Sequence, residues 1–267
     1  MSDVHVPADV SPMIPRTLFN EDHEAFRATA RRFFETEIAP YHEKWEEQQH
    51  LDRELWNKAG EFGLLCATMP EEYGGCGVDR LYSMILMEEQ ARVGDSASGF
   101  ALHSDIVANC INNFGSHEQK SQWLPKMATG ELVGALAMTE PSAGSDVQRI
   151  KTKALRDGNA YKMSGQKTFI TNGQHANLIL VAAKTDPSLG SKGVSLMALE
   201  TDGAEGFTRG RNLDKVGLHA ADTSELFFDE IELPPENVLG MDEGRGFYQM
   251  MQQLPQERLI IGAGAVG

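Results

Sequence analysis

Glu257 is a candidate for acid–base chemistry in this sequence of 267 residues. It lies in the segment QQLPQERLII, between Leu254 and Leu259. A carboxylate held against apolar side chains has its pKa raised toward the range that suits a base at neutral pH. The alternative is an exposed helical glutamate, which is the commoner case. Pro255 removes one backbone N–H from this helix, so we expect a kink there.

A second candidate is the turn AMTEPSAGSD, residues 137–146. An apolar strand ends here in a run of small residues that includes Gly144 and Ser145. Small residues allow close backbone approach, and successive free N–H groups in such a turn can hold anionic oxygens. A solvated β-turn would use the same residues, so the turn alone does not decide between the two.

A third candidate is the segment KTFITNG, residues 167–173, which reads as a strand ending in an Asn-Gly turn. Phe169 and Thr171 share one face of that strand. The aromatic ring could flank a planar ligand, and the hydroxyl could donate a hydrogen bond to the edge of that ligand. A half-buried strand with no ligand is an equally simple interpretation.

The elements that position these residues change near residue 132. From Asn20 to Gly130 apolar residues recur at helical spacing, which predicts a series of helices. Asn20 is placed to cap the first helix, and Ser116 with Gln119 forms a capping box for the last one. Another helix is expected around Ile106, Cys110 and Phe114, ending at Gly115.

From Leu132 the pattern changes to short apolar or alternating runs bounded by turn residues, which predicts an antiparallel β-barrel or sandwich. A helical pattern returns after Pro235 and continues to the last residue. We therefore predict a helical domain at 17–131, a β domain at 132–236 and the first helix of a further helical domain at 237–267. A chain that stops inside an element suggests a fragment of a larger protein.

Composition excludes several classes of function. The net charge is 24 − 39 = −15, which disfavours nucleic acid and anionic membranes as partners. No apolar run is long enough to span a membrane, and the first residues resemble neither a signal nor a transit peptide, so we expect a cytoplasmic protein. Three widely spaced cysteines predict free thiols, and no metal site is expected.

The ending GAGAVG, residues 262–267, matches a dinucleotide-binding fingerprint. That fingerprint needs a preceding strand, a following helix and an acidic residue about 20 positions later. The sequence ends at Gly267 without that context, so we interpret the match as accidental. His103 and His219 are expected to be ordinary hydrogen-bonded polar residues.

AMTEPSAGSD, FITNG and DKVGLHAADTSELFFDEIELP follow one another in an order and spacing that closely resemble the acyl-CoA dehydrogenase family, from about Phe19 to Gly267. The resemblance implies a flavoprotein that uses FAD to introduce a trans α,β double bond into an acyl-CoA thioester. It also implies electron-transfer flavoprotein as acceptor, a role in fatty acid β-oxidation and a homotetramer. The segment LPQERL is most similar to the long-chain and isovaleryl branch, which places the catalytic base on this helix.

The resemblance also implies roles for individual residues. Glu257 would remove the α proton, and flavin N5 would accept the β hydride. The residues expected at FAD are Leu136, Met138, Thr139, Gly144, Ser145, Phe169, Ile170 and Thr171. The residues expected at the substrate are Ser145, Ser191, Lys192, Tyr248, Pro255, Gln256 and Arg258. Phe169 stands where many members have Trp, and Arg149 stands where a small residue is usual and could narrow the approach to the turn.

Two alternatives stay open. An acyl-CoA oxidase would share the fold and the flavin but would return electrons to oxygen. A chain without most of the C-terminal helical domain could instead be catalytically inactive and bind only flavin or acyl-CoA.

Overall fold

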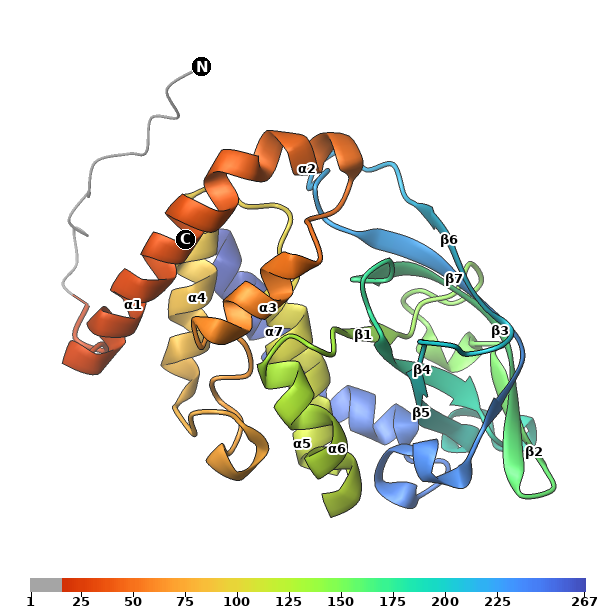
Figure 1. Cartoon of the computed structure of the whole chain (residues 1–267). Helices are drawn as coiled ribbons and strands as arrows, with labels where there is room; N and C mark the ends of the chain where they lie inside the picture. The colour runs from red at the N-terminus through yellow and green to blue at the C-terminus, as the bar shows by residue number, and fades with distance from the viewer. Residues whose placement is uncertain (1–15) are drawn as a thin grey trace.

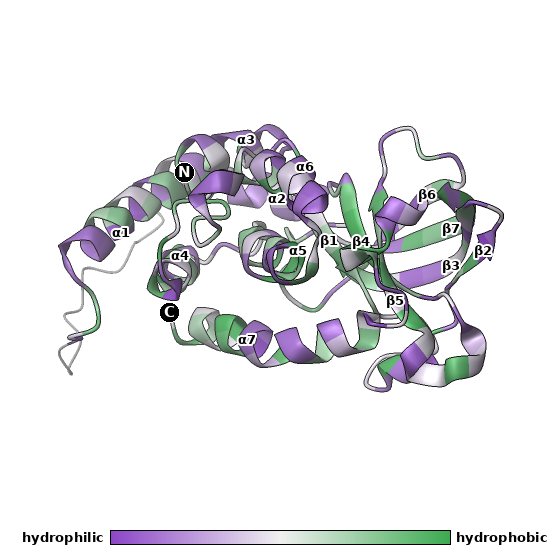
Figure 2. Cartoon of the chain, turned by 90° about the horizontal axis from the view of Figure 1, so that it is seen from below, coloured by the Kyte–Doolittle hydropathy of each residue, from purple (hydrophilic) through white to green (hydrophobic). Residues whose placement is uncertain are grey.

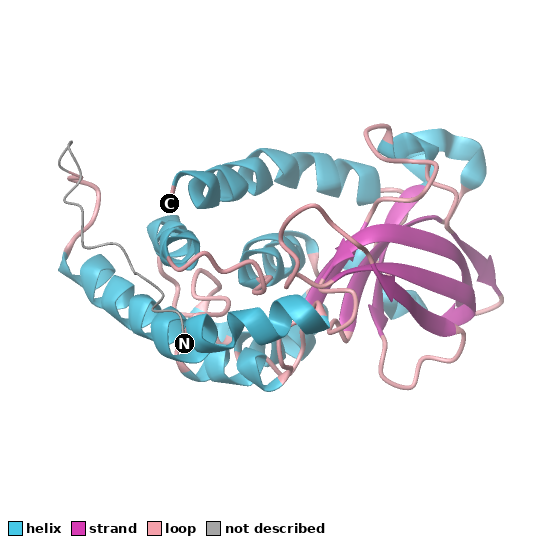
Figure 3. Cartoon of the chain, turned by 90° about the horizontal axis from the view of Figure 1, so that it is seen from above, coloured by secondary structure: helices cyan, strands magenta, loops and turns pink. Residues whose placement is uncertain are grey.

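The computed structural model describes residues 16–267 as a set of helices, a curled β-sheet and a long final helix (Figure 1). The helices occupy one side of the molecule and the strands the other (Figure 3). The final helix α7 (Gly246–Val266) starts beside the strands and runs back along the helical side (Figure 2). The fold class predicted from the sequence, helical first and β in the middle, is confirmed.

Local sequence signals set the boundaries of the N-terminal helices. The Asn20 side chain accepts a hydrogen bond from the backbone N–H of His23, and Ser116 and Gln119 form the predicted capping box. Such caps satisfy backbone groups that a helix end leaves unpaired. The helices that precede the sheet are α1 (Glu21–Phe33), α2 (His42–Gln48), α3 (Glu54–Glu61), α4 (Arg80–Arg92), α5 (Asn109–Phe114) and α6 (His117–Ala128).

A π-helical stretch, η4 (Leu102–Ala108), leads directly into α5 and was not predicted. Every residue from His103 to Ile111 is buried. This helix is therefore buried on all sides. Strand β1 (Gly134–Ala137), α6 and α7 pack around it, so it is a core helix rather than an amphipathic surface helix.

The sheet has seven strands in the order β1-β4-β2-β3-β7-β6, with β5 paired to β4. The remaining strands are β2 (Lys153–Asp157), β3 (Ala160–Thr171), β4 (Leu178–Lys184), β5 (Val194–Glu200), β6 (Phe207–Asn212) and β7 (Thr223–Leu233). Most pairings are antiparallel, as expected, but β1 and β2 each run parallel to β4. The sheet is therefore mixed, because the chain crosses between these strands through longer connections than a hairpin. The sequence pattern also missed β2 and β6.

Helix α7 is continuous through Pro255, and it includes most of GAGAVG. The glycine-rich ending therefore has a helix before it instead of a strand, which confirms that the fingerprint match is accidental. Cys66, Cys76 and Cys110 are free thiols, as predicted. Within residues 16–267, no helix is long and apolar enough to cross a membrane.

His103 connects the core helix to the sheet. Its Nε2 donates to the carbonyl of Met127 at 3.0 Å, and its Nδ1 accepts from the N–H of Gly134 at 3.0 Å. Burial lowers the pKa of His103 to about 4, so the ring is neutral at pH 7. β1 lies so close to the helix that a Cβ on Gly134 would meet Val107 Cγ1 at 2.8 Å. The expectation of an ordinary hydrogen-bonded histidine is confirmed.

A buried ion pair connects β3 to the segment that follows β1. Lys167 Nζ lies 2.9 Å from Glu140 Oε1, and the two side chains are 0% and 3% exposed. Glu140 also accepts from the backbone N–H groups of Lys151 and Thr152. Burial lowers the pKa of Lys167 to about 8, although Glu140 opposes the shift. Burial acts to raise the pKa of Glu140, but Lys167 and the N–H donors outweigh it and hold that pKa below its ordinary value.

The neutral state of His103 predicts a loss of stability in mild acid. Unfolded histidine binds a proton near pH 6.5, whereas folded His103 does so only near pH 4, so the unfolded state gains protons first as the pH falls. The free energy of unfolding should therefore drop by on the order of 3 kcal/mol more between pH 7 and 4 in the wild type than in His103→Gln. Urea unfolding at a series of pH values measures this. The exposed His219→Gln variant should follow the wild type, and parallel curves for the wild type and His103→Gln would contradict the prediction.

The Lys167–Glu140 pair predicts a large cost for removing one partner. Lys167→Met leaves a buried carboxylate without its counter-charge, and we expect a loss of about 3–5 kcal/mol in the free energy of unfolding. The matched control is Lys162→Met on the same strand, because the Lys162–Asp157 pair is 44% and 61% exposed. That variant should lose less than about 1 kcal/mol. Urea unfolding measures both losses. Equal losses in the two variants would show that burial of the Lys167–Glu140 pair does not raise the cost of removing one partner.

Candidate functional site

The structure brings together two segments that the sequence predicted at a flavin. The backbone N–H of Thr168 donates to the carbonyl of Thr139 at 2.9 Å. Lys167 Nζ donates to the carbonyl of Met138 at 2.9 Å. The end of β1 and the end of β3 are thus joined by one main-chain bond and one charged side chain, and the candidate residues on both segments share one region.

Phe169 has an unusual conformation in this region. Its φ is 60°, in the left-handed region that non-glycine residues seldom adopt, and its side chain is 66% exposed. It lies at a register shift between β3 and β7, between Lys167 and Ile170. Ile170 is buried, whereas Thr171 is half-buried. An exposed aromatic ring on a strained, well-anchored backbone is typical of a binding site rather than of a structural strand.

The turn after β1 is tight on one side and open on the other. Glu140 and Ala143 exchange two backbone hydrogen bonds of 3.0 Å, and both residues are buried. Gly144 and Ser145, which follow, are exposed. A Cβ built on Gly144 would meet no atom within 4 Å, so the protein leaves space beside this residue.

Glu257 faces the protein interior from α7. It is only 9% exposed, and burial raises its pKa, with a partial opposing effect from the charge of Arg258. Cys110 of α5 lies close by, since its own pKa is raised to about 12 by burial and then by the charge of Glu257. A carboxyl group in this setting holds its proton more tightly than an ordinary glutamate and is a stronger base once ionised.

One apolar cluster connects the base helix with the end of β1. This cluster includes Cys110 of α5 and Met250 of α7, and Leu136 and Met138 pack against it. Cys110 and two of the predicted flavin residues, Leu136 and Met138, therefore share a continuous packed region.

The other predicted substrate residues fall into two groups. Ser191 and Lys192 lie in the 3₁₀ segment η6 (Pro187–Gly193), which packs against the turn that precedes α7: a Cβ on Gly244 would meet the Lys192 carbonyl at 2.3 Å. Tyr248, Pro255 and Arg258 are exposed on α7. Tyr248 lies nine residues and Pro255 two residues before Glu257, so both side chains point away from Glu257 by about half a turn around the helix axis.

Gln256 is close to Glu257, but its polar atoms are used inside the protein. Its Oε1 accepts from Asn109 at 2.9 Å, and its Nε2 donates to the carbonyl of Asp105 at 2.9 Å. Its amide is therefore engaged with the core helix.

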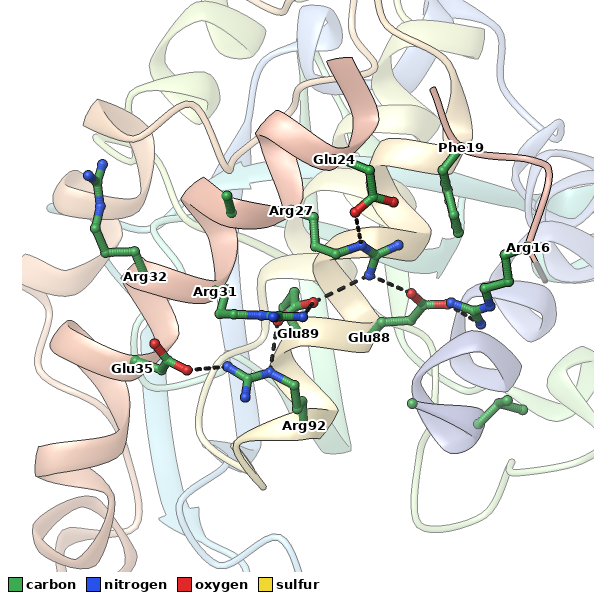
Figure 4. A pocket seen from close by; sticks show the side chains of 13 residues that line it. Arg16, Phe19, Glu24, Arg27, Arg31, Arg32, Glu35, Glu88, Glu89 and Arg92 are labelled. Carbon is green, nitrogen blue, oxygen red and sulfur yellow. Dashed lines mark hydrogen bonds and ion pairs between the residues drawn. The ribbon is translucent and has the colours of Figure 1, made fainter. Parts of the chain in front are cut away.

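A separate pocket of about 810 Å³ lies between α1, α4 and the end of α7 (Figure 4). Arginines and glutamates alternate along it and pair with one another: Arg27 with Glu88 at 2.7 Å, and Arg31 and Arg92 with Glu89 at 2.9 Å each. Burial acts to raise the pKa of Glu89, but the hydrogen bonds from its arginine partners hold it below its ordinary value. This network fastens α1 to α4 and contains none of the candidate site residues.

Sequence reasoning missed the roles of Lys167, Glu140 and Asn109 in holding the site together, and for His103 it predicted a hydrogen-bonded residue without its partners. Strand alternation places Lys167 on the same side as Phe169, yet Lys167 is buried and Phe169 is exposed, because the register shift between Lys167 and Ile170 interrupts the alternation. No local signal in the sequence therefore predicts the burial of Lys167. Glu140, His103 and Asn109 bind partners from other parts of the chain, and no local sequence pattern predicts those partners.

Comparison with known proteins agrees with this geometry. Residues 20–131 match the family described as acyl-CoA dehydrogenase, N-terminal domain, and residues 135–231 match acyl-CoA dehydrogenase, middle domain. The long-chain specific acyl-CoA dehydrogenase of Rattus norvegicus mitochondria is 46% identical over 248 residues, which cover 92% of this chain and 57% of that protein.

Solved structures show the same relationship. The acyl-CoA dehydrogenase of Geobacillus kaustophilus is 50% identical with a TM-score of 0.90, covering 94% of this chain and 66% of that one. An acyl-CoA dehydrogenase of Bacillus anthracis in complex with FAD is 34% identical with a TM-score of 0.87, covering 95% of this chain and 43% of that one. The chain thus spans less than two thirds of the length of these relatives. The two matching domains, in the order and with the fold described above, show that the chain belongs to the acyl-CoA dehydrogenase family.

Proposed function

We propose that the protein containing this chain is an FAD-dependent acyl-CoA dehydrogenase that converts an acyl-CoA thioester into the trans-2-enoyl-CoA. The observation that carries the proposal is Glu257, a buried carboxyl with a raised pKa. Its helix packs on the same apolar cluster as Leu136 and Met138. A base in an apolar environment beside a candidate flavin segment is the arrangement this reaction needs.

The residues present suit a flavin. Phe169 offers an exposed aromatic face, Thr171 offers a hydroxyl on the same strand, and the turn leaves open space at Gly144. Leu136, Met138, Thr139, Ser145 and Ile170 complete the set that would hold FAD, as the family resemblance implies. When bound, FAD supplies the acceptor for the hydride from the β carbon.

The chain's own residues act on the α carbon. An α C–H of a thioester is a weak acid, so its proton leaves only to a well-placed base while charge on the carbonyl is stabilised. We assign the removal of this proton to Glu257. The low exposure of the carboxyl keeps water away and raises its basicity. The positive charge of Arg258 opposes that rise in pKa.

The further roles follow from the family resemblance and stay predictions. Ser145, Ser191 and Lys192 would contact the CoA portion, and Tyr248, Pro255, Gln256 and Arg258 would lie toward the acyl side. Electron-transfer flavoprotein would accept the electrons, and the assembled protein would be a homotetramer.

The role of Glu257 predicts a specific spectroscopic defect. Anaerobic addition of acyl-CoA thioesters of increasing chain length should bleach the flavin absorbance of the complete protein. In Glu257→Gln we expect the bleaching rate to fall by about 10²- to 10⁴-fold with the flavin still bound, since only the proton acceptor is lost. The exposed Glu47→Gln variant on α2 is the control and should bleach normally.

Other outcomes of that experiment separate the alternatives. A bound flavin that no thioester bleaches would overturn the substrate class, and a Glu257→Gln variant that bleaches normally would overturn the assignment of the base. Oxygen consumption without any added acceptor would identify an oxidase. Absence of flavin from the complete protein would favour a chain that does not catalyse the reaction.

The strained backbone at Phe169 predicts that a glycine substitution there weakens flavin binding but has little effect on the free energy of unfolding. Glycine adopts a φ of 60° without strain, which offsets the lost side-chain packing, so Phe169→Gly should change the free energy of unfolding by less than about 1 kcal/mol. Loss of the aromatic face should weaken flavin binding about tenfold. Flavin titration and urea unfolding of the same samples measure both. Phe227→Ala, at a 39% exposed phenylalanine on β7, is the control and should keep its flavin affinity.

A further inference from the structure

Asn109, the first residue of α5, connects three helices. Its Nδ2 donates to Gln253 Oε1 at 2.5 Å and to Gln256 Oε1 at 2.9 Å, both on α7. Its Oδ1 accepts from Arg80 of α4 at 3.0 Å. Asn109 is 2% exposed, so these bonds form away from water and would be costly to lose.

The two glutamines lie on the same face of α7 as Glu257. Positions 253, 256, 257 and 260 are spaced three and four residues apart, so they share one stripe of the helix. Gln253, Glu257 and Ile260 are all buried on that stripe. Gln256 makes a second bond to the core helix, from its Nε2 to the Asp105 carbonyl. Rotation of α7 about its axis would therefore break every one of these bonds.

We propose that Asn109 is a positioning residue for Glu257: it fixes the rotation of α7 so that the carboxyl stays buried beside Cys110. This inference rests on the proposed function, because it concerns the base of that reaction. Asn109 does not itself touch the reacting atoms. It acts through Gln253 and Gln256, and the π-helical stretch η4, which ends immediately before it, sets the direction in which it points.

Few charges surround Glu257 in residues 16–267. Arg258 on α7 acts to lower its pKa, and Cys110 on α5 is a protonated thiol at neutral pH. Asp105 of η4 is bound to Ser83 at 2.6 Å, and burial raises its pKa. Arg80 of α4 is directed to Asn109. The burial that Asn109 maintains is thus the main cause of the raised pKa of Glu257.

The first test is kinetic and uses the complete flavin-loaded protein. Asn109→Ala should lower the rate of flavin bleaching by acyl-CoA about 10- to 100-fold and shift the apparent pKa of that rate downward, because Glu257 becomes more solvated. Asn113→Ala, at an exposed asparagine of the same helix, is the matched control and should leave both unchanged. The double variant Gln253→Leu/Gln256→Leu should reproduce the effect of Asn109→Ala, and the triple variant should show no further loss.

The second test needs neither flavin nor substrate. A glutamate with a raised pKa keeps its proton in the folded state after the unfolded state has lost its own, so it lowers stability as the pH rises above about 4.5. The stability gained by Glu257→Gln should therefore grow with pH in the wild-type background. In the Asn109→Ala background this gain should become independent of pH.

The outcomes distinguish the two levels of inference. If Glu257→Gln abolishes bleaching but Asn109→Ala, with normal flavin content and melting temperature, keeps the wild-type rate and pKa, the positioning role is overturned and the proposed function stands. Additive losses in the triple variant would also overturn it. If Glu257→Gln bleaches normally, the proposed function and the inference fail together. If Asn109→Ala unfolds, the Gln253→Leu/Gln256→Leu variant decides by the same two measurements.

Discussion

The structure depends on one buried helix whose polar side chains are all satisfied by other elements. Residues 103–111 are buried without exception, yet the helix carries polar groups on several sides. His103 binds β1 and the end of α6, Ser104 accepts from the backbone of Cys66, Asp105 binds Ser83 of α4, and Asn109 binds α7. Each unpaired buried polar group would cost about 1–3 kcal/mol, so these neighbours can occupy only the positions that satisfy them.

This constraint connects the two halves of the candidate site. One end of the helix fixes β1, whose continuation carries Met138 and Thr139, and the other end fixes α7, which carries Glu257. In the proposed reaction a base and a hydride acceptor act on adjacent carbons of one substrate, and small errors in their separation would reduce the rate steeply. Because β1 and α7 both pack against this one helix, the two candidate segments have less freedom to move relative to each other than two independent loops would have.

How much of this was readable from the sequence depends on the distance between partners. The caps Asn20 and Ser116 were predictable because each bonds to a backbone group three residues away. The inward orientation of Glu257 was predictable in part, since apolar residues surround it along the chain. The burial of the helix at residues 103–111 on all sides was not predictable. Its polar residues are typical of a solvent-exposed face, and the side chains that bind them lie up to 147 residues away along the chain. The parallel pairing of β1 with β4 was not predicted for the same reason, because the alternating pattern of a strand does not show which other strand it pairs with.

Glu140 and Glu257 are both buried near the site, but their different surroundings suit them to different roles. Glu140 receives a lysine and two backbone N–H donors, which together outweigh burial and keep it ionised. A carboxylate so firmly held is a poor proton acceptor, and its effect is to fasten the turn to β3. Glu257 is buried among apolar groups with one exposed arginine beside it, so burial dominates and its pKa rises. Such divergent environments are the physical basis for assigning structure to one carboxyl and proton transfer to the other.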